Sequence, residues 1–300
     1  LILGVAMRSL KRGSYDDDDD NDDDDNDAHK QSQQTRKEQQ RPVEHEPCTK
    51  PDYLERNVRY NADETALLDD DDDAVMMEWE RPLMEAHASI ITSNGTTGKR
   101  VLNVGFGMGI VDTYLQTHDP SLHVIIEAHP GVHAKMIKDG WDRKPGVRVE
   151  FGRWQVVVPK LIAEGVELDG IFYDTYGEHY TDMEDFHSQM VRLLAKPGGI
   201  YSFFNGLAPD NLFFHGVACQ CVKLQLAKLG LDTEFAQCQI QVSRKEWEGV
   251  RRKYWHGRDT YYLPIATWNK DALAQGDADV VGSNDASKDC NETVTKKLKT

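Results

Sequence analysis

Three glycines at alternate positions form the first pattern in this sequence whose residue types and spacing could do chemistry. Gly105, Gly107 and Gly109 lie in VGFGMGI, at the end of the apolar run RVLNV. Glycine has no Cβ atom, so the backbone can turn tightly there and approach a ligand closely. A dinucleotide-binding turn would have glycine at position 110, where this sequence has Ile110. The G-x-G-x-G form is the one that methyltransferases place around the amino-acid end of S-adenosylmethionine; the alternative is a tight turn without a ligand.

Polar residues end the next two apolar runs. Glu127 closes HVIIE, where a carboxylate can accept hydrogen bonds from both hydroxyls of a ribose. Trp154 and Gln155 follow the third run in GRWQ; the indole could lie against adenine, and the amide could donate and accept at the base edge. A core tryptophan is the alternative for Trp154. Together these residues predict a nucleoside site at the carboxyl ends of neighbouring strands, where open α/β sheets bind ligands.

Two further acids suit a planar cation. Asp174 ends the fourth apolar run in YDTYGEHY, and Glu80 lies upstream of the sheet in VMMEWERP. A guanidinium forms bidentate pairs with carboxylates. Methylation also requires the attacking nitrogen to lose a proton, which a nearby carboxylate can accept while it orients the nitrogen. The alternative for Glu80 is an ordinary exposed acid of a helix.

The elements that must position these residues can be read from hydrophobic periodicity. Apolar runs predict strands that are covered on both faces, at residues 100–104, 123–127, 147–151, 170–174 and 199–204. Periodic segments between them predict helices at residues 110–117, 132–139, 154–164 and 182–194. This alternation indicates a parallel sheet with helices on both faces. Further patterns predict an amphipathic helix at 75–91, a long helix at 211–229, and a closing antiparallel pair at 234–242 and 261–268.

The negative charge of the chain is local. Of its 51 acidic residues, ten aspartates lie in residues 16–27 and five in residues 69–73; without these fifteen, 36 acids face 35 bases. That balance argues against direct binding of nucleic acid, which needs clustered Lys and Arg. For the acidic tracts two interpretations stay open, solvated disorder and electrostatic steering of a basic partner.

Composition predicts one folded domain between polar ends. Residues 1–52 and 269–300 lack the apolar side chains that a core needs and are expected to be disordered, whereas residues 53–268 hold all six tryptophans. The apolar segment 1–7 is far shorter than the roughly 20 residues that cross a membrane, so no membrane association is expected. Five cysteines without a CxxC pair predict no metal site and favour a reducing, intracellular compartment.

The chemistry-bearing motifs resemble those of fungal protein arginine N-delta-methyltransferases and, more distantly, of guanidinoacetate methyltransferases. The resemblance covers residues 53–268 and is carried by VMMEWERPLM, VLNVGFGMGI, IIEAHP, GRWQ, GIFYDTYGEHY, LLAKPGGIYSFFNGL and YYLPIATW. It implies a class I, Rossmann-like, S-adenosylmethionine-dependent methyltransferase fold: a mostly parallel seven-stranded sheet with an antiparallel final strand. It also implies methylation of the internal delta nitrogen of an arginine in a protein, with large-subunit ribosomal proteins as the substrate class.

The resemblance also suggests where the cofactor and the acceptor bind. The positions that match cofactor contacts, the first three more loosely, are Tyr60, Met76, Met84, Gly105, Phe106, Gly107, Met108, Gly109, Ile110, Glu127, Ala128, His129, Trp154, Gln155 and Asp174. Glu80 and Asp174 align with the two acids that hold the guanidino group in small-molecule relatives, so both are expected to be catalytic. The family usually carries ankyrin-type repeats before this domain, and this chain opens on Leu1, so it is expected to be part of a longer protein. The resemblance also implies a location in cytoplasm and nucleus.

Two other functions stay open at this point. One is a small-molecule guanidino methyltransferase; the other is a non-catalytic module that holds S-adenosylmethionine or docks basic ribosomal proteins through its aspartates. The pair of acids, Glu80 and Asp174, favours an enzyme over such a module. No pattern in the sequence predicts an oligomeric state.

Overall fold

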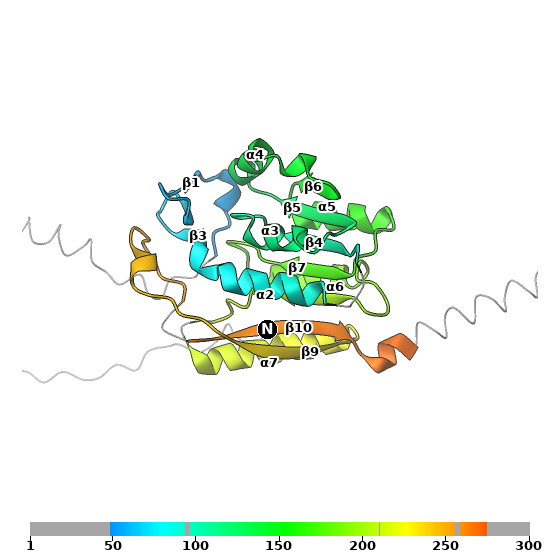
Figure 1. The fold of residues 1–300 in the computed structure, drawn as a ribbon. Helices are drawn as coiled ribbons and strands as arrows, with labels where there is room; N and C mark the ends of the chain where they lie inside the picture. The colour runs from blue at the N-terminus through cyan, green and yellow to red at the C-terminus, as the bar shows by residue number, and fades with distance from the viewer. Residues whose placement is uncertain (1–48, 94–96, 210, 256–258, 275–300) are drawn as a thin grey trace, which may run out of the picture. The chain divides into compact units, whose positions relative to one another are not determined.

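The computed structural model of the chain describes residues 49–93, 97–209, 211–255 and 259–274. The acidic tract at 16–27, the apolar segment 1–7 and most of the predicted C-terminal tail lie outside these described residues. The described residues form a seven-stranded sheet with helices on both faces and a separate three-stranded sheet (Figure 1).

The seven-stranded sheet contains all the strands that we predicted. Its order is β6-β5-β4-β7-β8-β10-β9; the first five are parallel, and β10 is antiparallel to β8 and to β9. The strands are β4 Arg100–Val104, β5 Leu122–Glu127, β6 Val147–Phe151, β7 Gly170–Tyr173, β8 Ile200–Phe203, β9 Leu231–Gln239 and β10 Thr260–Trp268. A mostly parallel sheet with an antiparallel final strand confirms the predicted fold class.

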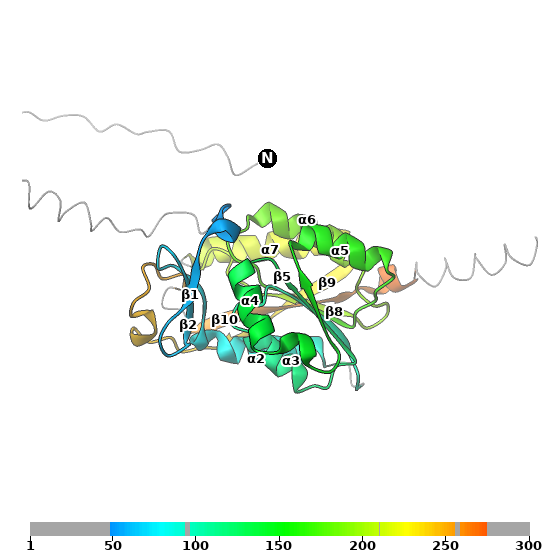
Figure 2. The same cartoon turned by 90° about the horizontal axis from the view of Figure 1, so that it is seen from above.

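Helices cover both faces of this sheet. They are α2 Arg81–Ile91, α3 Ile110–Gln116, α4 Pro130–Lys138, α5 Trp154–Ala163, α6 Tyr180–Met190 and α7 Leu212–Lys228. The first three pack on one face and the last three on the other (Figure 2). Neighbouring strand residues alternate between the two cores: Val101 packs with α2 to α4, and Leu102 packs with α5 to α7. Burial on both faces explains why the central strands are apolar almost throughout.

Strand β6 departs from that pattern. It lies at the edge of the sheet and pairs only with β5, its residues 147–150 are half-buried, and Phe151 is exposed. The prediction that this strand is covered on both faces is therefore wrong. The segment VRVEF alternates apolar and charged residues, a pattern that fits a partly solvated edge strand better than a strand covered on both faces.

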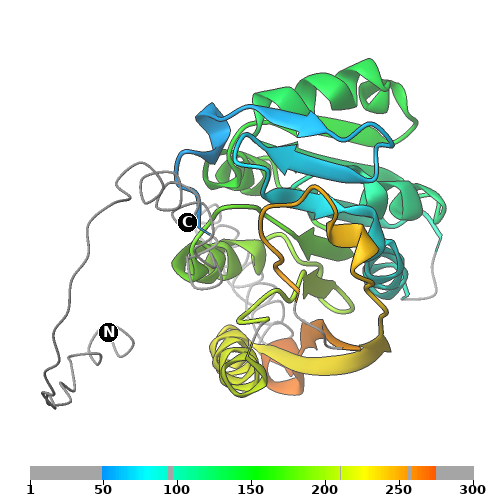
Figure 3. The ribbon, with the colours of Figure 1, turned by 90° about the vertical axis from the view of Figure 1, so that its left-hand side faces the viewer.

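The residues before the main sheet form a second, smaller sheet, where one prediction fails. Its antiparallel strands are β1 Val58–Tyr60, β2 Ala66–Asp69 and β3 Ala74–Met77. The helix predicted at 75–91 begins only at Arg81, after the 3-10 turn η2 Glu78–Glu80. Pro82 lies in the first turn of α2, where its missing N–H costs no helical hydrogen bond. The residues before it are free to pair with β2 instead (Figure 3).

The second acidic tract is an ordered part of this sheet: its middle residues 70–72 are exposed, and its two ends are buried. Asp69 ends β2, Asp73 precedes β3, and both side chains are almost fully buried. The ammonium of Lys50 binds Asp69 and lies 3.0 Å from Asp71 and 2.9 Å from Asp73. Disorder is thus the wrong interpretation for residues 69–73, because Lys50 and nearby arginines pair with their carboxylates. Lys50 belongs to the stretch that we predicted to be disordered.

The remaining described residues extend the fold slightly at its end. The backbone N–H of Asn269 donates to the Gly230 carbonyl at 2.9 Å, so the first residues of the predicted tail pack against the domain. The other 3-10 turns are η1 Tyr53–Glu55, η3 Trp141–Arg143 and η4 Lys245–Trp247. No helix within the described part of the chain is long and apolar enough to cross a membrane.

Candidate active site

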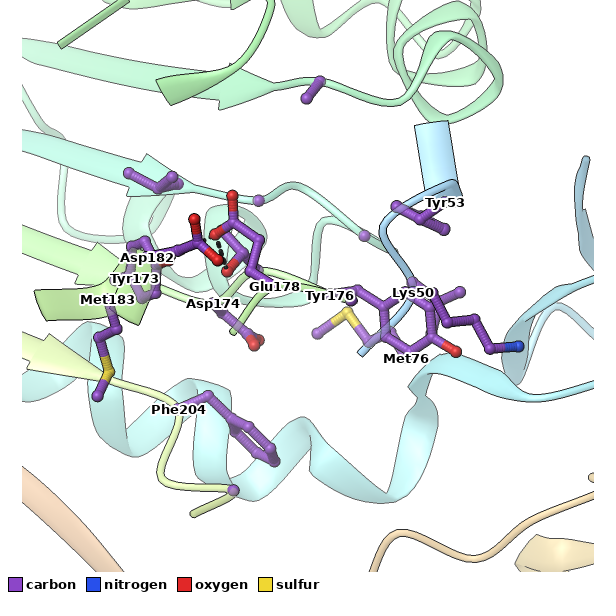
Figure 4. Close-up of a pocket in the computed structure, with 18 of the residues that line it drawn as sticks. Lys50, Tyr53, Met76, Tyr173, Asp174, Tyr176, Glu178, Asp182, Met183 and Phe204 are labelled. Atoms are coloured by element: carbon purple, nitrogen blue, oxygen red, sulfur yellow. Dashed lines mark hydrogen bonds between the residues drawn. The ribbon is translucent and has the colours of Figure 1, made fainter. Parts of the chain in front are cut away.

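A cavity of about 520 Å³ lies at the carboxyl ends of β4, β5 and β7. That volume is in the range of small-molecule and cofactor sites, and the place is where open α/β sheets bind ligands. Figure 4 shows its side chains, which come from the lead-in before β1, the small sheet and the loop after β7. Eight residues predicted for the site line it: Met76, Glu80, Gly105, Gly107, Glu127, Ala128, Trp154 and Asp174.

The glycine turn passes so close to the loop after β7 that a side chain could not fit between them. Gly105 has φ +95°, and a Cβ atom there would lie 1.9 Å from the carbonyl oxygen of Asp174. Gly107 has φ +55°, and its Cβ would meet the sulfur of Met76 at 2.6 Å. At position 105, the backbone carbonyl of Asp174 leaves no room for a side chain. At position 107, the left-handed conformation favours glycine, and a side chain would also press on Met76.

Glu127 holds the glycine turn in place. Its Oε2 accepts the N–H of Phe106 at 2.9 Å, and its Oε1 accepts the N–H of His129 at 2.6 Å. Burial raises the pKa of this carboxyl, against the effect of those backbone donors. Each carboxylate oxygen can accept a second hydrogen bond, so Glu127 keeps the capacity to bind ribose hydroxyls in the cavity.

The remaining predicted residues support the turn from outside the cavity. The Tyr60 hydroxyl donates to the Gly107 carbonyl at 3.2 Å, and the N–H of Met108 points to the Met76 sulfur at 3.2 Å. His129 caps helix α4 through its Nδ1. The other predicted residues that do not line the cavity are Met84, Phe106, Gly109 and Ile110, which lie in the core or the turn, and Gln155.

Glu178 is a central residue of the site that the sequence analysis missed. Its carboxylate accepts hydrogen bonds from the Trp154 indole at 3.0 Å, Gln155 Nε2 at 3.1 Å, the Tyr173 hydroxyl at 2.6 Å and Thr175 Oγ1 at 2.7 Å. It thereby ties the loop after β7 to the start of α5. The motif YDTYGEHY contains this acid, but only the folded loop brings its four donors together.

These bonds change the expectation for the adenine side. Trp154 is 3% exposed and packs edge-on against Phe186, with ring centroids 5.3 Å apart. The structure thus favours the core alternative for the indole, one edge of which still lines the cavity. The Oε1 atom of Gln155 is buried and accepts no hydrogen bond from any described residue. Because Gln155 does not line the cavity, the expected contact between its amide and the adenine edge stays a prediction.

Glu80 is a buried acid, unlike the exposed helix residue that was its alternative. The side chain is 3% exposed, and its Oε1 accepts the Met77 N–H at 2.9 Å and the hydroxyl of Tyr254. Burial and the nearby charge of Asp174 raise the pKa of Glu80 above its ordinary value. No hydrogen bond within the described chain ends on Glu80 Oε2.

Asp174 is the second acid of the cavity. Its N–H donates to the Val104 carbonyl at 2.9 Å, which fixes its backbone beside the glycine turn. Its carboxylate projects into the space between Phe204 and Met76 (Figure 4) and accepts no hydrogen bond from a described residue. Burial raises the pKa of Asp174. A buried and a half-buried carboxyl with unused oxygens suit a cation with several N–H donors, such as a guanidinium.

The lead-in before β1 also reaches the cavity. Lys50, Pro51 and Tyr53 line it, and the N–H of Lys50 donates to the Gly177 carbonyl at 2.8 Å. A segment rich in polar residues gave no reason to expect this contact, because the partners of Lys50 lie far along the chain.

Comparison with known proteins identifies the family. The model of the guanidinoacetate N-methyltransferase family matches residues 43–217, more than half of the chain, which therefore belongs to that family. Class I methyltransferases of this kind take their methyl group from S-adenosylmethionine, in agreement with the predicted cofactor. The spermidine synthase of Thermotoga maritima has the same fold, with a TM-score of 0.50 at 14% identity over 73% of this chain and 71% of that chain.

Curated relatives are named Protein arginine N-methyltransferase 2. The one from Yarrowia lipolytica is 43% identical over 72% of this chain and 47% of its own length. Those from Aspergillus fumigatus and Saccharomyces cerevisiae are 42% and 37% identical over 72% of this chain, and over 50% and 52% of their own lengths. The chain thus spans about half the length of these relatives.

Proposed function

We propose that this chain is the methyltransferase portion of a protein arginine methyltransferase. In this proposal it transfers a methyl group from S-adenosylmethionine to the internal delta nitrogen of an arginine, in a large-subunit ribosomal protein. The observation that carries the proposal is the pair of acids, Glu80 and Asp174, whose unused oxygens share one cavity with the glycine turn. The name of the curated relatives supports an arginine in a protein as the acceptor.

The residues of the chain fit both ligands of such a reaction. S-adenosylmethionine, when bound, supplies an electrophilic methyl group. The glycine turn would receive its amino-acid end, Glu127 its ribose, and the end of the cavity near Trp154 its adenine. Trp154 and Glu178 would act by holding that side of the cavity in shape.

The two acids would act on the acceptor. Asp174 and Glu80 would pair with the N–H groups of the guanidinium, which orients the delta nitrogen and draws its lone pair out of resonance. As the nitrogen–carbon bond forms, the nitrogen becomes more acidic, and one of the carboxylates takes its proton and passes it to solvent. Both acids must be ionised for this role, and the positive guanidinium lowers their pKa on binding.

A second candidate is methylation of a small guanidino compound. It is favoured by the matching family model, which describes guanidinoacetate N-methyltransferases, and by the same pair of acids. Incubation of the chain with labelled S-adenosylmethionine and either ribosomal proteins or guanidinoacetate separates the two. We expect one methyl group on the delta nitrogen of a protein arginine, identified by fragmentation in mass spectrometry. Transfer to guanidinoacetate alone would overturn the proposal, and methyl groups only on terminal nitrogens would overturn its regiochemistry.

Partners and location complete the proposal. A basic ribosomal protein suits a chain of formal net charge −16, and cytoplasm and nucleus are the compartments where it would meet such a protein. Cofactor binding without transfer to any acceptor would favour the non-catalytic module instead.

A further inference from the structure

The loop between β9 and β10 forms a wall of the cavity. Its described residues, 240–255 and 259, fold back across the small sheet; Figure 3 shows this gold segment in front of the cyan strands. The N–H of Arg251 donates to the Asp72 carbonyl at 2.8 Å, and its Nε donates to Asp73 at 3.0 Å. The same Asp73 binds Lys50, so the acidic hairpin ties this loop to the lead-in.

Aromatic packing holds the loop at its other end. The rings of Trp247, Tyr254 and Trp255 surround Trp79 at centroid distances of 6.0, 5.7 and 6.1 Å. Trp79 directly precedes Glu80 in η2. This packing places the Tyr254 hydroxyl on Glu80 Oε1, where the Met77 N–H also donates. The Tyr254 hydroxyl and the Met77 N–H donate to the same oxygen of Glu80, so Oε2 is the oxygen available to a ligand.

We propose that Tyr254 is a positioning residue for the reaction: its hydroxyl orients Glu80 so that the free oxygen faces the acceptor guanidinium. The inference rests on the proposed function. Tyr254 belongs to a loop in which the sequence analysis predicted no site residue. Tyr254 also lines the cavity, although its assigned role is exercised through Glu80.

The hydrogen bond also favours the charged form of Glu80. Burial and the charge of Asp174 raise the pKa of Glu80, whereas the Tyr254 hydroxyl lowers it. Tyr261 on β10 also interacts electrostatically with Glu80, and the charged residues Lys50, Asp73 and Arg252 line the same cavity. Removing the hydroxyl should therefore raise this pKa further and move the acid limb of the pH–rate profile to higher pH.

The test compares the Tyr254→Phe variant with the wild-type chain. We expect kcat/KM for the arginine acceptor to fall about 10- to 100-fold at neutral pH, the usual worth of a hydrogen bond to a charged group. The loss should shrink as pH rises, and the affinity for S-adenosylmethionine should stay unchanged in calorimetry. In a Glu80→Gln background the same substitution should cost little, because its partner charge is already gone.

Tyr201→Phe is the matched control. Tyr201 is fully buried and, like Tyr254, bonds a side chain through its hydroxyl, here His187 at 2.9 Å, but it lies outside the cavity. It should lose stability without any shift of the pH profile. If Tyr254→Phe does not fold, Arg251→Met loosens the same loop and should shift the profile in the same direction.

One readout does not depend on the acceptor. The carboxyl carbon of Glu80, assigned in labelled protein with Glu80→Gln, can be titrated by NMR in wild type and in Tyr254→Phe. A higher pKa in the variant supports the inference, and an unchanged pKa overturns it. Transfer to guanidinoacetate instead of protein would overturn the proposed function but not this inference, since the same titration still decides it. An equal, fully additive loss of kcat/KM in the Glu80→Gln background would overturn the positioning role.

Discussion

The two halves of the cavity are built on different principles. On the cofactor side, Glu178 accepts hydrogen bonds from four side chains, Glu127 accepts two backbone N–H groups, and the glycine turn is braced by Tyr60 and Met76. On the acceptor side, the Asp174 carboxylate accepts no hydrogen bond from the described chain, and Glu80 is held by only one oxygen. The cofactor side is thus shaped before any ligand arrives.

The acceptor side, by contrast, keeps an electrostatic imbalance. Burial raises the pKa of both acids, so their ionised forms are costly until a cation compensates them. In the proposed function, a guanidinium would remove that cost by binding, which would couple acceptor recognition to the charge state that the chemistry needs. The comparison therefore predicts that variants of the acceptor side lose turnover, whereas variants of the cofactor side lose affinity for S-adenosylmethionine.

Asp174→Asn should have the largest effect. It keeps the shape of the side chain but removes the charge that faces the guanidinium, so turnover should fall roughly 10²–10⁴-fold, the usual worth of a positioned acid–base group. Affinity for S-adenosylmethionine, measured by calorimetry, should fall far less. Asp185→Asn, an exposed aspartate of α6 outside the cavity, is the control and should behave as wild type. Retained turnover would refute the division between the two halves.

Gly105→Ala should have the next largest effect, on the cofactor side. A Cβ atom 1.9 Å from the Asp174 carbonyl must push the turn and the β7 loop apart. Overpacking and a left-handed conformation each cost about 1–3 kcal/mol, so affinity for S-adenosylmethionine should fall roughly 10- to 100-fold or more. Gly216→Ala in α7, where no atom lies within 4 Å, is the control and should bind normally. Unchanged affinity at position 105 would show that the turn does not shape the cofactor site.

The two halves also differ in how far the sequence predicts them. The cofactor side is built from short segments, each at the end of an apolar strand, so local periodicity locates Gly105 and Glu127 correctly at the edge of the sheet. Hydrogen bonds between distant segments carry no such local pattern. Glu178 needs donors from α5, and Glu80 needs Tyr254, which lies 174 residues later in the chain. The sequence therefore predicts which residues gather at the strand ends, but not which ones bond there.

The small sheet shows the same limit. Two predictions are wrong here. Residues 74–77, at the start of the helix expected at 75–91, pair with β2, and the tract at 69–73, expected to be disordered, is ordered around Lys50. In both cases the deciding partner lies outside the segment. Composition identifies a charged run, yet it does not say that a lysine nineteen residues earlier will lie inside it.

A smaller effect should appear in stability. The folded pKa of Asp174 lies above its unfolded value, so between the two the folded chain binds more protons, and stability falls as pH rises through that window. Asp174→Asn should remove this slope: equal stability at or below about pH 4, where the unfolded carboxyl is also protonated, but a melting temperature roughly 2–4 °C higher than wild type near pH 8, for about 1 kcal/mol relieved. Thermal melts of the ligand-free chain at both pH values measure this. A variant that is less stable at the higher pH would show that the carboxylate is compensated within the protein.

The smallest effect is expected from removing residues 1–48, which leaves Lys50 in place. If the first acidic tract only steers a basic partner, neither half of the cavity needs it: melting temperature and affinity for S-adenosylmethionine should stay the same. Methylation of a basic protein should slow at low salt, and the difference should vanish as salt screens the attraction. The matched control is Lys50→Met in the full chain, which leaves Asp69 and Asp73 without their shared ammonium and should lower the melting temperature. If the truncation slows methylation equally at low and high salt, the tract acts by direct contact and not by long-range electrostatic attraction. If the truncation lowers cofactor affinity, the cofactor side depends on the first 48 residues.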